Sequence, residues 1–191
     1  MSLSLYERAE FYNIAFYKWP KLVYDKGWIY GVWNIGACYK GTGYYGNYPH
    51  GYMDRISALF PDKENILHLF SGSLPRGDYT RFDIGLNPDA QYDVKGDAQE
   101  LSEHFEPNTF DIIYADPPYS QKDAENYNCK MPNRFKVVKE CAKVLKPGGF
   151  LVWLDEVLPM YRKAEFKRFG EIMISRSTNH RVRAVFIFER L

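Results

Sequence analysis

The residues best suited to chemistry are Asp116-Pro117-Pro118-Tyr119, which directly follow the apolar run 110–115. An exocyclic amino nitrogen is a poor nucleophile because its lone pair is delocalised into the ring. The carboxylate of Asp116 and the carbonyl of Pro117 can accept its two hydrogens and direct the lone pair at an incoming carbon. The fixed φ of proline holds such a carbonyl in place, and Tyr119 can stack on a base. The alternative is a purely structural role, in which these residues form a proline-rich turn and Asp116 only ends a strand.

Strand-like and helix-like segments alternate from Asn65 onward, and they must position this string. Short apolar runs bounded by Gly, Pro and Asp predict strands at 66–70, 80–86, 91–95, 110–115 and 150–154. Apolar spacings of three and four predict helices at 51–60, 135–145 and 159–169, the second ended by Lys146-Pro147-Gly148-Gly149. Segments 171–175 and 183–188 can pair as a terminal hairpin. The pattern predicts an α/β sandwich with a mainly parallel sheet and an antiparallel edge.

Polar residues follow each of the first three predicted strands, where a parallel sheet binds its ligands. Ser71-Gly72-Ser73 follows the first strand, Asp83 lies in the second, and Asp97 follows the third. A turn of small residues lets a ligand approach the backbone closely, and a carboxylate can take both hydroxyls of a ribose. Taken singly, the turn is common and each Asp could be a surface carboxylate. Their succession along the chain favours a binding site.

The order of these segments resembles the class I S-adenosylmethionine-dependent methyltransferase fold, over about residues 45–191. Asp116-Pro117-Pro118-Tyr119 is similar to the signature of its amino-methylating branch, known from DNA adenine N6 and cytosine N4 methyltransferases. The resemblance implies a Rossmann-like α/β fold, S-adenosylmethionine as cofactor and this string as the catalytic motif.

The same resemblance implies roles for residues around the cofactor. Phe70, Ser71, Gly72 and Ser73 would lie against its methionine part. Asp83 would bind the ribose hydroxyls, and Asp97 and Ala98 would meet the adenine. Segment 45–51, which contains Tyr48 and Pro49, is similar to the cofactor-side segment that precedes the glycine turn in adenine methyltransferases.

The connections after the first two predicted strands are too short for crossover helices, which usually need about a dozen residues. We therefore expect abbreviated early helices in this fold. Residues 1–50, which are rich in Tyr, Phe and Trp, are expected to form an aromatic extension packed on the core. Residues 51–191 would form the methyltransferase domain, and the two parts together a single structural domain. The aromatic residues can form a second small core or stack on bases.

The substrate is less defined than the chemistry, because the chain has no room for the long target-recognition region of such DNA methyltransferases. Only 120–132 could form a substrate loop. We expect adenine N6 in DNA as the substrate, with DNA favoured over RNA. A specificity subunit or another partner protein is expected to supply the missing recognition. An RNA guanine or adenine amino group, a protein glutamine amide and a non-catalytic binding subunit remain alternatives.

The charge is balanced overall, at +1, but residues 157–191 hold eight Lys and Arg against three acids. Part of this excess, Arg162, Lys163, Lys167 and Arg168, falls in the predicted helix 159–169. Such a basic segment can track phosphates or form a solvated face. Glu165 and Glu171 lie among these residues and could neutralise part of it.

Cys38, Cys129 and Cys141 are odd in number and lack metal spacing, so we expect free thiols. The four histidines are scattered, and no metal site is expected. Neither an apolar run of membrane-spanning length nor a signal peptide is visible, which predicts a cytoplasmic protein. With 46% hydrophobic and 26% charged residues, the composition is that of an ordinary globular domain.

Overall fold

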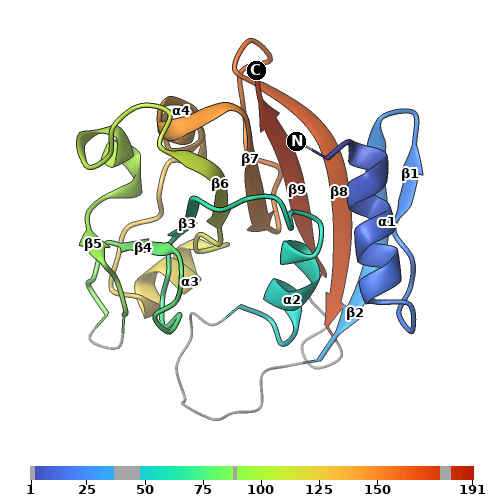
Figure 1. Cartoon of the computed structure of the whole chain (residues 1–191). Helices are drawn as coiled ribbons and strands as arrows, with labels where there is room; N and C mark the ends of the chain where they lie inside the picture. Colours follow the sequence, from blue (N-terminus) through green and yellow to red (C-terminus); the bar gives the residue numbers. More distant parts are fainter. Residues whose placement is uncertain (1–2, 37–47, 88–89, 177–181) are drawn as a thin grey trace.

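The computed structural model describes residues 3–36, 48–87, 90–176 and 182–191. Within these residues nine strands form one mixed sheet, in the order β1-β2-β8-β9-β7-β6-β3-β4-β5 (Figure 1). The strands are β1 (Val23–Asp25), β2 (Trp28–Ile35), β3 (Ile66–Leu69), β4 (Thr80–Asp83), β5 (Val94–Lys95), β6 (Phe110–Ala115), β7 (Leu145–Asp155), β8 (Phe166–Arg176) and β9 (Val182–Arg190). The helices are α1 (Leu5–Ala15), α2 (Tyr52–Ser57), α3 (Gln121–Asn126), α4 (Arg134–Val144) and the 3-10 helix η1 (Ala98–Glu103).

Strands β3 to β7 form the parallel part of the sheet, and their order reverses between β3 and β6. The order β5-β4-β3-β6-β7 corresponds to 3-2-1-4-5 in a doubly wound sheet, whose ligands bind at the switch point beyond the carboxyl ends of the central strands. Leu67 of β3 pairs with Ile113 of β6, and both are fully buried. The predicted α/β fold with a mainly parallel sheet is confirmed.

The predicted terminal hairpin is confirmed: β8 and β9 are antiparallel, and β9 is also antiparallel to β7. Its turn lies outside the described residues. The helix predicted at 159–169 is wrong, because residues from Phe166 onward pair with β9 instead. A bulge between Arg168 and Gly170 interrupts the alternation of the strand, so Phe166 and Phe169 are both buried at a spacing that resembles a helix.

The early connections are abbreviated, as expected. Strand β4 pairs in parallel with both β3 and β5, yet the described residues of 70–79 and 84–93 contain no helix. Helices η1 and α4 cover one face of this part of the sheet, where Leu101 and Val138 join the buried cluster of β3 and β6. The turn 146–149 ends α4 as predicted, but the structure places it inside β7.

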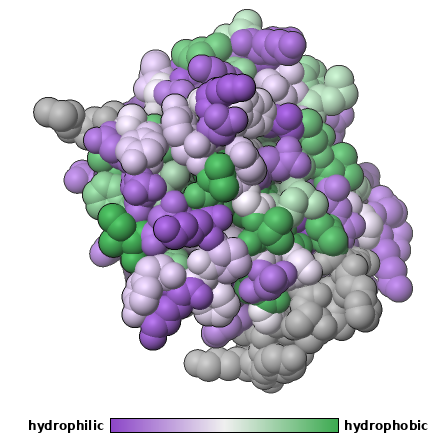
Figure 2. All heavy atoms as spheres, turned by 90° about the vertical axis from the view of Figure 1, so that its right-hand side faces the viewer, coloured by the Kyte–Doolittle hydropathy of each residue, from purple (hydrophilic) through white to green (hydrophobic). Residues whose placement is uncertain are grey.

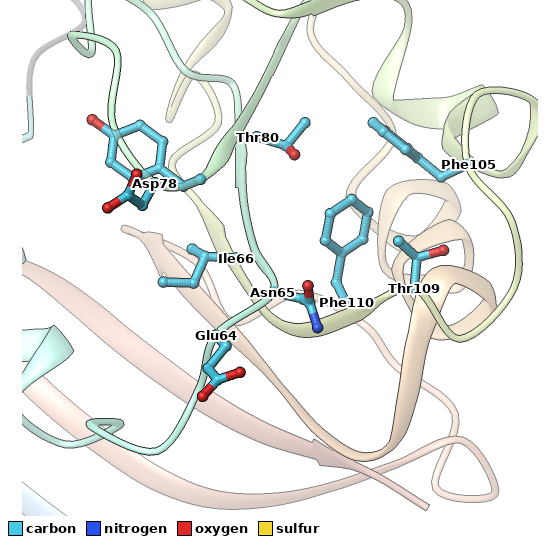
Figure 3. Close-up of a pocket in the computed structure, with 9 residues that line it drawn as sticks. Glu64, Asn65, Ile66, Asp78, Thr80, Phe105, Thr109 and Phe110 are labelled. Atoms are coloured by element: carbon cyan, nitrogen blue, oxygen red, sulfur yellow. The ribbon is translucent and has the colours of Figure 1, made fainter.

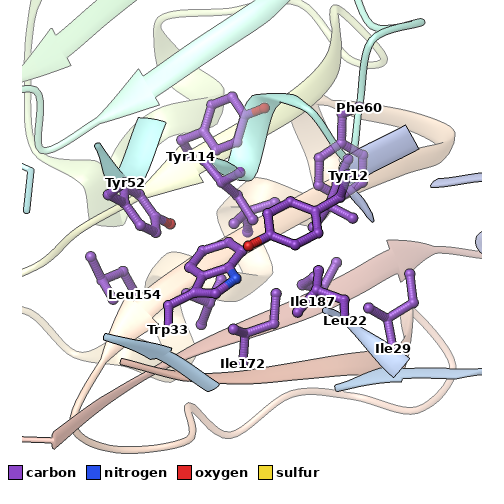
Figure 4. Close-up of a cluster of buried hydrophobic side chains, with 14 of the residues drawn as sticks. Tyr12, Leu22, Ile29, Trp33, Tyr52, Phe60, Tyr114, Leu154, Ile172 and Ile187 are labelled. Atoms are coloured by element: carbon purple, nitrogen blue, oxygen red, sulfur yellow. The ribbon is translucent and has the colours of Figure 1, made fainter. Parts of the chain in front are cut away.

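The N-terminal residues contribute two strands and a helix that sequence periodicity did not reveal. Strand β2 pairs in parallel with β8 and so extends the sheet. Helix α1 begins with a capping box between Ser4 and Glu7. Tyr12 of α1 stacks on Trp33 of β2 with ring centroids 5.5 Å apart, and Tyr52 lies beside them in the core (Figure 4).

A buried ion pair fixes this aromatic core to the segment after α2. The guanidinium of Arg8, which is fully buried, donates to Asp62 through Nη2 at 2.9 Å and to the carbonyl of Leu59 at 3.0 Å. Other aromatic side chains of this region remain exposed among polar ones on the face that carries α1, β1 and β2 (Figure 2); they include Tyr6, Phe11, Tyr17, Trp19, Trp28 and Tyr30. The N-terminal aromatics thus form both a core and a surface.

Two further predictions concern the cysteines and membrane-spanning segments. Cys129 and Cys141 are free thiols, whereas Cys38 lies outside the described residues. None of the helices in the described ranges is long and apolar enough to cross a membrane.

Candidate functional site

The string Asp116-Pro117-Pro118-Tyr119, predicted to be catalytic, and the glycine turn meet at the switch point of the sheet. The backbone N–H of Asp116 donates to the carbonyl of Leu69, the last residue of β3, at 3.5 Å. Pro117 and Pro118 are buried behind it. The residues that follow β3 and β6 therefore lie together at the carboxyl ends of the parallel strands, as the sequence predicts. We call this end of the strands the carboxyl edge of the sheet.

The turn after β3 has a tightly defined backbone. Phe70 and Gly72 both adopt positive φ, at +62° and +53°. The hydroxyl of Ser71 donates to the carbonyl of Gln91 at 2.6 Å, and the N–H of Gln91 donates to the carbonyl of Gly72 at 2.6 Å. Positive φ is unusual for a residue with a side chain, so the conformation of Phe70 must be imposed by this hydrogen-bonded surrounding. Ser73 is half-buried at the end of the turn.

Asp83 joins the turn to the neighbouring strand. Its Oδ2 accepts from the N–H of Gly72 at 3.1 Å, and its Oδ1 accepts from the N–H of Gly85 at 2.8 Å. A carboxylate offers about four lone-pair positions, so these two bonds leave capacity for a ligand's hydroxyl groups. The structure thus brings Asp83 and Gly72 into contact at the place where the resemblance implies a ribose.

Asp97 has a structural role in addition to its predicted one. It is the N-cap of η1, where its Oδ1 accepts from the N–H of Gln99 at 2.9 Å. Ala98, the next residue, is buried under the same edge. The carbonyl of Asp83 accepts from Gly96 at 3.0 Å, which holds this segment beside β4. Asp97 and Ala98 therefore lie one strand further from Asp116 than Asp83 does.

Tyr48 and Pro49 approach the site from the opposite face. The ring of Tyr48 stacks on Tyr52 at 5.4 Å, and its hydroxyl lies 3.1 Å from Nδ1 of His68. The carbonyl of Pro49 accepts from the N–H of Tyr52, which begins α2. Burial raises the pKa of Tyr48 well above its usual value, and the nearby charge of Asp116 raises it further. That influence places Tyr48 close to the catalytic string.

His68 lies in the middle of this aromatic group. The rings of Tyr48, Tyr79 and Tyr114 surround it at centroid distances of 5.7, 4.6 and 5.2 Å. Burial lowers the pKa of His68 to about 4, so its imidazole is neutral at pH 7. This residue was not predicted as part of the site.

Tyr119 contacts the carboxylate of its own motif. Its hydroxyl donates a short hydrogen bond to Oδ1 of Asp116. Burial and then the charge of Asp116 raise the pKa of Tyr119 well above its usual value, so the hydroxyl keeps its proton and remains a donor. The Cζ atom of Arg183 lies 4.3 Å from the centre of the ring. One face of the ring on which a base was expected to stack is therefore covered by a guanidinium in this structure.

Arg134 and Asp155 form a support that the sequence analysis missed. Asp155 is fully buried at the end of β7 and accepts from Nε of Arg134 at 2.7 Å. The same guanidinium donates through Nη2 to the carbonyl of Tyr119 at 2.9 Å. Asp83 and Asp97 were predicted as binding residues because they lie at the carboxyl ends of parallel strands. Asp155 lies at the carboxyl end of β7, the fifth strand predicted from the sequence, and meets the same criterion. The predicted strand ended one residue too early to reveal it.

The segment proposed as a substrate loop contains a short helix. Ser120 caps α3, its hydroxyl accepting from the N–H of Asp123 at 3.2 Å. Burial raises the pKa of the Cys129 thiol, and the charge of Asp83 adds to this effect, which places the end of the segment near the ribose-binding candidate. Among the described residues no three His, Cys, Asp or Glu side chains are grouped as metal ligands.

A cavity of about 430 Å³ lies elsewhere in the molecule (Figure 3). Its lining includes Ile66, Thr80 and Phe110, the first residues of β3, β4 and β6. These are the amino ends of the parallel strands, whereas the candidate site lies at their carboxyl ends. The cavity therefore opens at the other end of the strands, although Tyr79, which lines it, also contacts His68.

Known proteins give only distant comparisons. No family model and no curated protein matches the chain. Among solved structures, TrmN from Thermus thermophilus is similar at 17% identity and a TM-score of 0.46, over 67% of this chain and 44% of that one. The PH0226 protein from Pyrococcus horikoshii OT3 is similar at 15% identity and 0.44, over 73% and 88%. The trans-methyltransferase CalH, in complex with SAH, is similar at 12% identity and 0.45, over 66% and 51%.

The chain thus spans less than half of TrmN and about half of CalH. Likeness at this level concerns the fold and carries no information about what this chain binds or converts. The strand order and the hydrogen bonds at the carboxyl ends of the strands are observed in this structure and do not depend on these comparisons.

Proposed function

We propose that this protein transfers a methyl group from S-adenosylmethionine to an exocyclic amino group of a nucleic-acid base, with adenine N6 in DNA as the leading substrate. The observation that carries the proposal is the position of Asp116. Its N–H is bonded to the end of β3, so its carboxylate and the glycine turn share the switch point of the sheet. A cofactor site and an acceptor for an amine are adjacent there.

The residues at the edge fit the cofactor. Gly72 has positive φ and no side chain, so no Cβ stands between this turn and a ligand. The carboxylate of Asp83 has unused acceptor positions next to that turn. Asp97 and Ala98 follow along the same edge and would border the adenine. When bound, S-adenosylmethionine would supply an electrophilic methyl group.

Asp116 and Pro117 act on the acceptor. The Asp116 carboxylate and the Pro117 carbonyl would each accept one hydrogen of the amino group, which localises the lone pair on nitrogen. The Tyr119 hydroxyl already donates to Oδ1 of Asp116, so this oxygen is shown to accept a hydrogen bond from the side where Tyr119 lies. Arg134 holds the backbone carbonyl of Tyr119 and thereby the end of the string. Positioning of this kind accounts for much of the rate enhancement in bimolecular transfers.

The test is mass-spectrometric nucleoside analysis of DNA and RNA incubated with the protein and isotopically labelled S-adenosylmethionine. We expect labelled N6-methyladenine in the DNA. A labelled guanine or adenine from RNA would support the RNA alternative. Binding of the cofactor without label in either nucleic acid would support a non-catalytic subunit and contradict the proposal.

Asp116→Ala serves as the mechanistic variant. We expect methyl transfer to fall by about 10²–10³-fold, because one positioned acceptor is lost from the transition state. Cofactor affinity, measured by calorimetry, should stay within a few-fold of the parent. Asp54→Ala, which removes an exposed carboxylate of α2, is the matched control. Near-normal turnover of Asp116→Ala would contradict the assigned role.

A further inference from the structure

Arg183 lies at the same edge of the sheet as the catalytic string. It is the second residue of β9, and its neighbour Ala184 pairs with Asp155 at the carboxyl end of β7. Its guanidinium covers the ring of Tyr119, with Cζ 4.3 Å from the ring centroid. The hydroxyl of that same ring donates to Asp116. Arg183 is thus one side chain away from the proposed acceptor site.

The guanidinium of Arg183 is not neutralised by any carboxylate in the described part of the chain. Its buried Nε–H also finds no hydrogen-bond acceptor there. Arg168 of β8 also has a buried Nε–H without an acceptor, but its guanidinium pairs with Glu171 at 3.4 Å, and that of Arg134 on α4 pairs with Asp155 at 2.7 Å. A buried donor without an acceptor is costly, and such groups usually have a partner. The site therefore holds a cation and a free donor next to the place where substrate must enter.

We propose that Arg183 binds a backbone phosphate of the nucleotide whose base reaches Asp116. This inference rests on the proposed function and narrows its substrate to a phosphodiester. A guanidinium offers five N–H donors in a planar fork that matches two phosphate oxygens. A phosphate is separated from its base only by the sugar, so both can be contacted from one edge of the sheet. A glutamine amide of a protein brings no anion and would leave Arg183 unpaired.

The guanidinium of Arg183 covers one face of the Tyr119 ring, and a base that stacks on this face would compete with it. A base that stacks on the covered face requires Arg183 to leave it, and the released guanidinium then needs an anionic partner. The incoming nucleotide carries that partner. Arg183 is therefore a substrate-binding residue that exchanges the tyrosine ring for a phosphate when the base enters.

Binding of mixed-sequence duplex DNA and of an RNA duplex, each followed by fluorescence anisotropy at several salt concentrations, tests this role without requiring catalysis. The variants are Arg183→Gln, Arg183→Lys and, as matched control, Arg162→Gln. Arg162 is an exposed arginine that precedes β8 at the opposite edge of the sheet. A DNA duplex with methylphosphonate linkages, which lack the backbone charge, is the matched probe.

We expect Arg183→Gln to weaken binding and to reduce the slope of log affinity against log salt by about 0.9 for duplex DNA, the effect of one phosphate contact. Arg183→Lys should retain most of the slope, and Arg162→Gln all of it. Parent and Arg183→Gln should bind the methylphosphonate duplex equally. Circular dichroism and cofactor affinity, both expected to be unchanged, show whether Arg183→Gln is folded.

Three results would overturn the inference. If Arg183→Gln and the parent have the same slope on both duplexes, Arg183 contacts no phosphate, although the nucleic-acid function can stand. If Arg183→Gln lowers the affinity for the methylphosphonate duplex as much as for the natural duplex, the contact is not to a phosphate. If the parent itself shows no salt-dependent binding to either nucleic acid, the proposed function and the role of Arg183 fail together.

Discussion

The Tyr119 hydroxyl donates to Oδ1 of Asp116 and so occupies one of the acceptor positions of this carboxylate. We expect an acceptor amine that binds through Oδ1 to compete with this hydroxyl. We expect Tyr119→Phe to lower the KM for the nucleic-acid acceptor, by roughly tenfold if one hydrogen bond to a charged group no longer has to be exchanged. Steady-state methyl transfer with varied acceptor concentration measures this change.

Tyr119→Ala provides the contrast, because it also removes the ring that stacks on a base. Its KM should rise rather than fall, since base stacking is worth about 1–3 kcal/mol. Tyr24→Phe, at an exposed tyrosine of β1, should behave as the parent. A higher KM for Tyr119→Phe would mean that the hydroxyl assists the substrate instead of occupying its place.

Sequence reasoning identified candidate site residues at the carboxyl ends of strands, and the structure brings these candidates together. Ser71-Gly72-Ser73, Asp83 and Asp116 meet at one edge because parallel strands end on the same side of a sheet. Arg134 and Arg183 could not be found in this way, because they reach the site from the start of a helix and from an antiparallel strand. Their side-chain directions depend on packing that no local pattern records.

Helix α4 and strand β7 hold the catalytic string through the Arg134–Asp155 pair. Arg134→Lys keeps the positive charge beside Asp155 but cannot reach both this carboxylate and the carbonyl of Tyr119 in the same fork geometry. We expect kcat to fall by about 10- to 100-fold, with little change in cofactor affinity, because the acceptor groups shift relative to the cofactor. Single-turnover kinetics and calorimetry separate the two effects.

Arg190→Lys is the matched control for this change. Arg190 also donates to a backbone carbonyl, that of Ala142, but at the far end of β9. Its replacement should alter stability without altering kcat. Equal losses of kcat in both variants would show that Arg134 acts through overall stability.

His68 on β3 should make stability depend on pH. Its pKa is about 4 in the folded protein, below the ordinary value of 6.5, because the ring is buried among tyrosines. The unfolded chain therefore binds the proton first as pH falls. The free energy of unfolding should decline from pH 6.5 to pH 4, by roughly 3 kcal/mol from this residue.

Urea unfolding at several pH values measures this decline, and His68→Phe should flatten it in that window. His104→Gln, at an exposed histidine, is the control and should leave the decline in place. A parent whose stability is constant between pH 6.5 and pH 4 would contradict the shifted pKa.

Elements were predictable where local pattern and packing agree. Segment 110–115 is a continuous apolar run and becomes β6 with those bounds, because both faces of this strand are covered. Segment 159–169 misled the prediction because a bulge gave a strand the spacing of a helix. Strand β2 was missed, although Ile29, Trp33 and Ile35 on one face are buried, because large aromatics such as Trp28 and Tyr30 are exposed on the other face.

The basic residues 162–168 lie far from the site at the scale of the whole molecule. Phe166 pairs with Arg190, at the end of the strands opposite to Ala184 and Asp155, and the stretch of β9 between Arg190 and Ala184 spans roughly 20 Å. Arg162 and Arg168 also pair with Glu165 and Glu171, as the sequence suggested. We expect replacing Arg162, Lys163, Lys167 and Arg168 by Gln to leave the salt dependence of DNA binding nearly unchanged.

Anisotropy titrations of this quadruple variant at several salt concentrations measure the effect. Loss of several units of slope, the result for four phosphate contacts in duplex DNA, would show that nucleic acid wraps to the opposite edge. A small loss would agree with a contact area confined to the edge of Asp116.

The pairing of β2 with β8 joins residues from opposite ends of the sequence, as in Ile29 with Gly170. During synthesis β2 can pair only with the neighbouring β1 until nearly all of the chain has left the ribosome. Contacts between such distant residues slow folding, and exposed strands invite association in the interval. The strand pairs of the doubly wound half join residues that are closer in the sequence, such as Ile66 with Ile112, so this half can form earlier. The protein should therefore fold in two kinetic steps, and β1 and β2 should join the sheet in the second step.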